Sequence, residues 1–133
     1  MAGRPLDYSS QALKRPATVK AAAAVTKGFG VIFGSVDTEV ENSGANGKVS
    51  GIALETGAAG EVVTIAEDGI VPVLVGTGGA TRGEFAIMAA DGFTNQTLGG
   101  GTTVKYIAGK FMQSGVFGDY VGLKVNFFAA GAA

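Results

Sequence analysis

The 133-residue sequence contains no cysteine, no histidine and no tryptophan. Without the first two, disulfides, thiol nucleophiles, Ser-His and Cys-His dyads and the usual zinc sites are excluded. The apolar runs, such as 21–25 and 70–75, are far shorter than the about 20 residues of a membrane-spanning helix. The first residues lack a compact apolar stretch after their basic side chains, so we expect neither a membrane partner nor a secretory signal.

Charge is also scarce, because only 16% of the residues are charged whereas 47% are apolar. The mean hydropathy is +0.33. The length suffices for one domain with one core. Such an apolar composition predicts that part of the surface is buried against another chain. The absence of cysteine fits an intracellular or virion setting.

The few charges are unevenly placed along the chain. Residues 1–20 hold four basic side chains and one acidic one, a balance of 4 − 1 = +3, whereas residues 21–133 hold six basic and ten acidic ones, a balance of 6 − 10 = −4. Pro5 and Pro16 break any helix in the first segment and bias the residues before them to extended backbone. We therefore predict an extended N-terminal arm over 1–20 and a β-rich domain over 21–133.

The arm carries apolar side chains that a solvated tail does not need. We expect it to order on a partner, and the alternative is an ordinary disordered terminus. The residues that we assign to this partner-binding arm are Arg4, Pro5, Leu6, Tyr8, Leu13, Lys14, Arg15 and Pro16.

The rest of the chain is organised around a repeat. Val49–Ile65 returns 58 positions later as Ile107–Leu123, and Lys27–Phe33 returns 55 positions later as Arg82–Met88. In the first pair, an apolar run ends in a polar pair, a Gly-x-x-Gly corner follows, and an acidic residue opens a new run, which is typical of a β-hairpin. We predict two related halves of one small β domain, and chance similarity in a chain rich in Gly, Ala and Val is the alternative.

Local composition predicts the remaining elements. Strands are expected over 29–36 and 70–75, two strands joined by a corner over 103–128, and a strand or short helix over 85–90. Ala21–Val25 fits a helical turn or the start of a strand. Exposed loops are expected over 37–48, where Asn46-Gly47 is a turn signal, and over 91–102.

Pro72 places the run Ile70–Val75 at a sheet edge or bulge, because proline cannot donate to the ladder. An apolar edge strand invites aggregation unless something covers it, and we expect a sister subunit to do so. The resulting candidates for a subunit interface are Ile70, Val71, Pro72, Val73, Leu74, Phe127 and Phe128.

No pattern in the sequence predicts a cofactor or a metal site. The runs Gly76–Gly79 and Gly99–Thr103 lack the Gly-Lys-Ser/Thr of a phosphate-binding loop, so turn glycines are favoured. Asp37, Glu39 and Glu41 alternate, but the EF-hand pattern is missing, and a solvated acidic face is favoured over a calcium site.

Catalytic chemistry is equally unsupported. Glycoside hydrolysis would need a pair of carboxylates, and the candidates Glu55, Glu61, Glu67, Asp68 and Asp119 include two at equivalent hairpin corners, where an acid can accept hydrogen bonds from turn amides. The acidic body also lacks a basic, aromatic-studded face for nucleic acid. We expect neither an enzyme nor a nucleic-acid-binding protein.

The run from Gly51 to Val63, GIALETGAAGEVV, continuing to the Gly-led strand after Asp68, resembles the signature of phage capsid decoration (head cement) proteins. Ile107–Leu123 resembles the closing segment of the same family. The resemblance covers residues 25–128, and the insertion Asn42–Gly47 departs from a compact version of it.

The resemblance implies a small β-barrel or β-tulip-like domain. It also implies a homotrimer on the outer capsid surface of the virion, at three-fold or quasi-three-fold axes, where it stabilises contacts between major capsid proteins. Arms of such proteins can add a strand to the major capsid protein, so the resemblance implies that the arm of this chain binds the capsid. It also implies that the protein is made in the host cytoplasm. A β-structured head- or tail-fibre module that binds a host glycan is the alternative.

Overall fold

The computed structural model describes residues 16–35 and 38–132, and every regular element in them is a β-strand. No helix in this part of the chain is long and apolar enough to cross a membrane. The strands fall into two groups of five along the chain. They are β1 (Pro16–Ala21), β2 (Gly30–Phe33), β3 (Glu39–Asn42), β4 (Gly51–Ala53), β5 (Val62–Ala66), β6 (Ile70–Leu74), β7 (Phe85–Ala89), β8 (Gly92–Gln96), β9 (Val104–Phe111) and β10 (Tyr120–Gly131).

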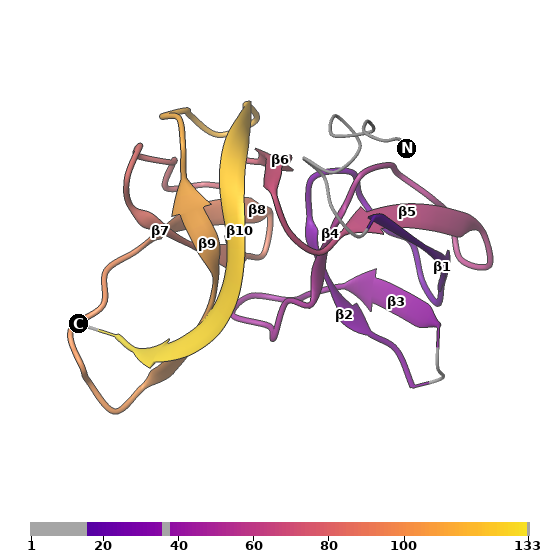
Figure 1. Cartoon of the computed structure of the whole chain (residues 1–133), viewed down its shortest axis with the longest axis horizontal. Coiled ribbons are helices and arrows are strands. Elements are labelled where there is room, and N and C mark those ends of the chain that lie inside the picture. The colour runs from indigo at the N-terminus through magenta and orange to yellow at the C-terminus, as the bar shows by residue number, and fades with distance from the viewer. Residues whose placement is uncertain (1–15, 36–37, 133) are drawn as a thin grey trace, which may run out of the picture.

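The first five strands close into a barrel in the order β1-β3-β2-β4-β5. β1 completes the barrel because it pairs antiparallel with β5 on one side and parallel with β3 on the other. The second five form a sheet in the order β6-β10-β9-β7-β8, and a single parallel bridge from Val75 to Phe93 joins its two edges. Figure 1 shows the two groups side by side, with β6 and β10 at the centre of the molecule.

The two halves have the same topology. Strands β1, β2, β3, β4 and β5 correspond, in this order, to β6, β7, β8, β9 and β10. The parallel pairing of Ala21 with Val40 recurs as that of Val75 with Phe93. The prediction of a mainly β, barrel-like domain built from two related halves is therefore confirmed.

Equivalent hydrogen bonds support this correspondence. Val25 and Gly57 exchange backbone hydrogen bonds in the first half, and Ala80 and Gly115 do so in the second. The Lys27 N–H donates to Thr56 Oγ1, as the N–H of its counterpart Arg82 donates to Ser114 Oγ. The two halves therefore share the same local hydrogen-bonding pattern.

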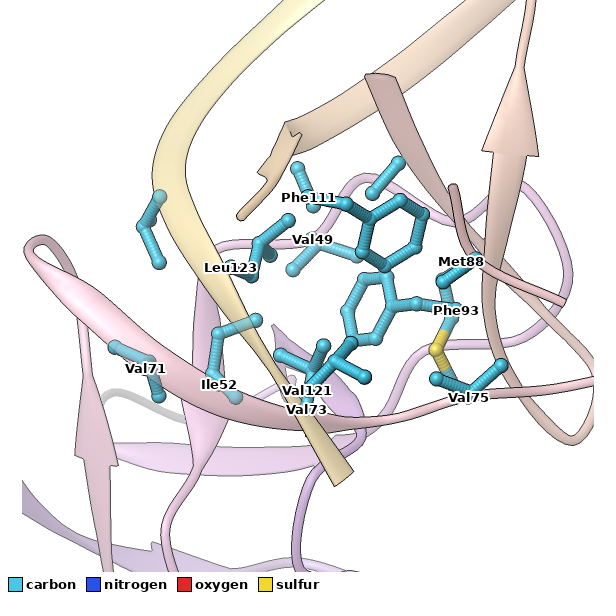
Figure 2. Close-up of a cluster of buried hydrophobic side chains, with 14 of the residues drawn as sticks. Val49, Ile52, Val71, Val73, Val75, Met88, Phe93, Phe111, Val121 and Leu123 are labelled. Atoms are coloured by element: carbon cyan, nitrogen blue, oxygen red, sulfur yellow. The ribbon is translucent and has the colours of Figure 1, made fainter. Parts of the chain in front are cut away.

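The halves are joined by a shared apolar core. The interior of the first barrel is filled by small and β-branched residues such as Val31, Val63 and Ile65. Val49 and Ile52 belong instead to the cluster that fills the second half, where they contribute to the same core as Phe93 and Phe111 (Figure 2). The first half therefore covers part of the second half's core.

Several sequence-based boundaries need correction. The predicted loop over 37–48 contains strand β3, and the predicted loop over 91–102 contains strand β8. The segment predicted as strand or helix over 85–90 is strand β7. The expected arm over 1–20 overlaps β1, because residues 16–20 pair with β5 along its full length. An arm can therefore extend only to residue 15.

Candidate interaction surface

The two hairpin corners use their acidic residues to hold the turn. Glu61 Oε1 accepts a hydrogen bond of 2.7 Å from the Ala58 N–H. Asp119 Oδ2 accepts the equivalent bond from the Val116 N–H at 3.0 Å. These carboxylates satisfy turn amides, as the sequence indicated, and that role requires no substrate.

The corners differ in what they expose. The two central residues of the first corner are alanines, whereas those of the second are Val116 and Phe117, which are 69% and 62% exposed. The shared turn geometry does not require large apolar side chains there. The second corner is therefore an apolar tip on the surface.

The interface candidates on β6 separate into two faces. Ile70 is 55% exposed and Pro72 is also exposed. Val71 and Val73 are fully buried in the core of their own chain, so assigning them to a subunit interface was wrong. The reason is the two-residue period of a strand, which sends alternate side chains to opposite faces.

The edge position predicted for β6 is confirmed, since β6 is the first strand of its sheet. Part of this edge is covered within the chain. The Leu74 N–H donates to the Gly28 carbonyl oxygen at 3.0 Å, and the Tyr120 hydroxyl lies 3.5 Å from the Lys27 carbonyl oxygen. The first half of the same chain therefore protects the end of β6.

Phe127 and Phe128 lie beside an irregularity in β10, where the pairing with β9 shifts between Val125 and Phe128. Both rings line a groove of about 390 Å³ together with Tyr106 and Lys48, the latter from the first half. Both rings are half-buried. The structure thus brings these two predicted residues together at one groove.

A second cleft, of about 360 Å³, lies across β7, β9 and β10. Phe85 and Phe128 form an edge-to-face pair there, with ring centroids 5.6 Å apart and planes at 83°. The Lys110 ammonium group lies 5.4 Å from the centre of the Phe85 ring, within range of a cation–π interaction. Lys124 and Asn126 complete the lining. Sequence reasoning missed this cleft.

The glycine-rich run Gly76–Gly79 is part of a turn held by Asp91. The Asp91 carboxylate accepts hydrogen bonds from the Thr77 hydroxyl at 2.6 Å and the Thr77 N–H at 3.1 Å. The Thr77 hydroxyl, followed by its N–H, holds the pKa of Asp91 below its ordinary value. The Asp91 carboxylate thus accepts the hydrogen bond from the Thr77 N–H, a backbone amide that a phosphate-binding loop would offer to its ligand.

Two other groups of predicted residues have mixed outcomes. Of the arm residues, Arg4 to Arg15 lie outside the described residues, and Pro16 is the first residue of β1. Within residues 16–35 and 38–132, no three acidic side chains gather as metal ligands would, and Asp37 lies outside those ranges.

Comparison with known proteins gives a likeness of fold. No family model matches the chain, and no curated protein matches it in sequence. A solved structure described as the head fiber gp8.5 N base in bacteriophage phi29 is similar, with a TM-score of 0.66 and 17% sequence identity. The similarity covers 84% of this chain and 92% of that chain, so the fold of the two halves is shared with the base of a phage head fibre.

Proposed function

We propose that the chain is a structural protein of a phage virion, mounted on the outer surface of the head. In this proposal it binds as a homotrimer at three-fold or quasi-three-fold axes and stabilises contacts between major capsid proteins. Its role is binding, with no catalytic step. The fold likeness to a head-fibre base, which extends over most of both chains, is the observation that carries the proposal.

The exposed apolar surface supports a binding role. Val116 and Phe117 form an apolar tip, and Ile70 and Pro72 form an apolar patch on the outer face of β6. Exposed apolar groups gathered in this way are typical of interaction sites. A trimer would present each of them three times, and rigid linkage would make three modest contacts act together.

A fibre base is the second candidate, and the same likeness favours it. In that case the chain would anchor a longer assembly to the head, and a host glycan would be bound by a part of that assembly or by the cleft beside Phe85. An aromatic ring next to ammonium and amide groups offers a stacking surface and hydrogen-bond donors.

The test is add-back of the purified chain to particles of its own phage that lack it. We expect saturable binding in fixed ratio to the major capsid protein, and particles that withstand heating better than bare ones. A chain that never co-sediments with the particles would contradict the proposal.

The contribution of the arm is tested by deleting residues 1–15, because a longer deletion would remove strand β1. The expected result is weaker capsid binding by a domain that melts as the full chain does. The matched control replaces Arg4, Lys14 and Arg15 with Gln, which keeps the arm's length and removes most of its charge. Unchanged binding after the deletion would show that the arm does not contribute to capsid binding.

A further inference from the structure

The two halves carry equivalent rows of residues, and only one row is covered. Gly30 pairs with Ile52 and Ile52 with Ala66 across β2, β4 and β5. At the same positions in the second half, Phe85 pairs with Lys110 and Lys110 with Lys124 across β7, β9 and β10. Directly paired residues point to one face, so each row lies on one face of its half.

The first row is covered by the second half. Ile52 and Ala66 are fully buried and belong to the core cluster of the second half. A Cβ placed on Gly30 would lie 3.1 Å from the Phe93 ring, which shows how closely the halves approach there. In the first half, this face is an interface.

The second row is open. Lys110 and Lys124 are exposed, and the 360 Å³ cleft lies over them. Two ammonium groups directly opposite each other on neighbouring strands repel and destabilise the sheet. A carboxylate-bearing partner would relieve this repulsion.

The chain itself carries such a partner surface. Residues 16–68 hold three basic and seven acidic side chains, a balance of 3 − 7 = −4, whereas residues 69–133 hold four basic and three acidic ones, a balance of 4 − 3 = +1. Among the acids, Glu55 and Glu61 are engaged by the backbone amides of Thr64 and Ala58. Glu39 and Glu41, which alternate on β3, have no such role in a turn.

Glu39 and Glu41 lie on the outer face of β3, because Val40 between them is buried in the first barrel. The second half approaches the first through β6, where Leu74 bonds to Gly28, and through Phe93 of β8. The equivalent strands of the first half are β1 and β3. Val40, the counterpart of Phe93, is buried in its own barrel, so a second copy whose β3 lay over the open row would contact it with Glu39 and Glu41.

We propose that the row Phe85–Lys110–Lys124 is a docking surface for a second copy of this chain, which offers Glu39 and Glu41 of its first half. The contact is head-to-tail, and contacts of this type close into rings where the rotation permits. The inference rests on the proposed homotrimer and names the surfaces that would build it. Lys20 lies opposite Glu39 in β1 and offsets one of the two negative charges, which leaves this face with a balance of 1 − 2 = −1.

The experiment is sedimentation of the full chain. At low ionic strength the wild type should form species that are multiples of 13.2 kDa, and these should dissociate as salt is raised to about 0.5 M. A double variant, Lys110→Glu with Lys124→Glu, and a second, Glu39→Lys with Glu41→Lys, should each lower the association constant by about tenfold or more.

Mixing the two variants gives the decisive result, because each then finds an oppositely charged surface on the other and association should return. The two variants must alternate, so the mixture should form species with an even number of chains and no closed trimer. The control is Lys48→Glu with Arg82→Glu, which changes the net charge equally away from the row and should associate as the wild type does. A wild type that stays monomeric up to about 100 µM at low salt, or a mixture that does not associate, overturns the inference. A monomer that still binds capsids would overturn only the inference and leave the proposed function standing.

Discussion

Asn46 Oδ1 accepts a hydrogen bond from the Tyr106 N–H at 3.1 Å, and this contact joins a loop of the first half to strand β9 of the second. The Asn46 amide also donates from Nδ2 to the Val104 carbonyl oxygen at 3.1 Å, and its backbone N–H donates to the Met88 carbonyl oxygen at 2.8 Å. Asn46 therefore contacts β9 through its side chain and β7 through its backbone N–H. These hydrogen bonds hold the loop of the first half against the second half.

Replacing Asn46 with Ala should destabilise the chain by about 1–3 kcal/mol, because two backbone groups lose their partners. The φ of Asn46 is +54°, a region that Asn and Gly tolerate better than Ala. Asn46→Gly is the matched control, since it removes the side chain and relieves the backbone. Denaturant titration measures the unfolding free energy of both variants. An Ala variant as stable as the wild type would show that the Asn46 side chain does not stabilise the contact between the halves.

The two faces of β6 should respond differently to truncation. Val73→Ala should cost about 1–3 kcal/mol of unfolding free energy, because it leaves a cavity in the shared core. Ile70→Ala should leave the unfolding free energy within about 0.5 kcal/mol, because the side chain is exposed. Equal losses at the two positions, measured by urea unfolding, would contradict the buried and exposed assignment.

The equivalent corner acids should have equivalent effects. Glu61→Gln and Asp119→Asn should each destabilise the chain by about 0.5–1.5 kcal/mol, because the bond to the turn amide loses its charge. The corners are in different halves, so the double variant should show the sum of the two losses. Thermal melting of the four proteins tests this, and a change at one corner alone would show that the two corners are not equivalent.

The turn held by Asp91 should make stability depend on acid pH. The Thr77 bonds lower the folded-state pKa of Asp91 below its ordinary value of 3.8. A depressed pKa stabilises the fold above the unfolded-state value and loses that contribution as the pH falls through the folded-state value. Melting temperatures from about pH 5 to pH 2 should therefore fall less steeply for Asp91→Asn than for the wild type, and parallel curves would contradict this role.

Much of the fold was predictable because the strongest signals were local. The Gly-x-x-Gly corners and the apolar runs on either side of them predicted the hairpins. Because this pattern occurs twice, it also predicted two related halves. Strands β3 and β8 were missed because Glu39–Asn42 and Gly92–Gln96 are polar and contain turn-forming residues, and their pairing depends on partners far away in the chain.

The surfaces were less predictable, because burial depends on how the halves meet. Val71 and Val73 were assigned to a subunit interface because Pro72 places their apolar run at a sheet edge, although alternation along the strand places them in the core. The row of Lys110 and Lys124 becomes visible only when the repeat is aligned at full length, where Lys110 falls on the position of Ile52. The signal available in the sequence was the presence of an apolar residue in one copy and a lysine at the same position in the other, which indicates that the two faces are not covered alike.

The proposal that the chain is a structural protein of a phage head is tested most directly by the protein content of purified virus particles from the source of the chain. The account predicts that quantitative mass spectrometry finds the chain in a fixed ratio to the major capsid protein, with immunogold label on the outside of intact heads. A chain abundant in infected cells but absent from washed particles would contradict it.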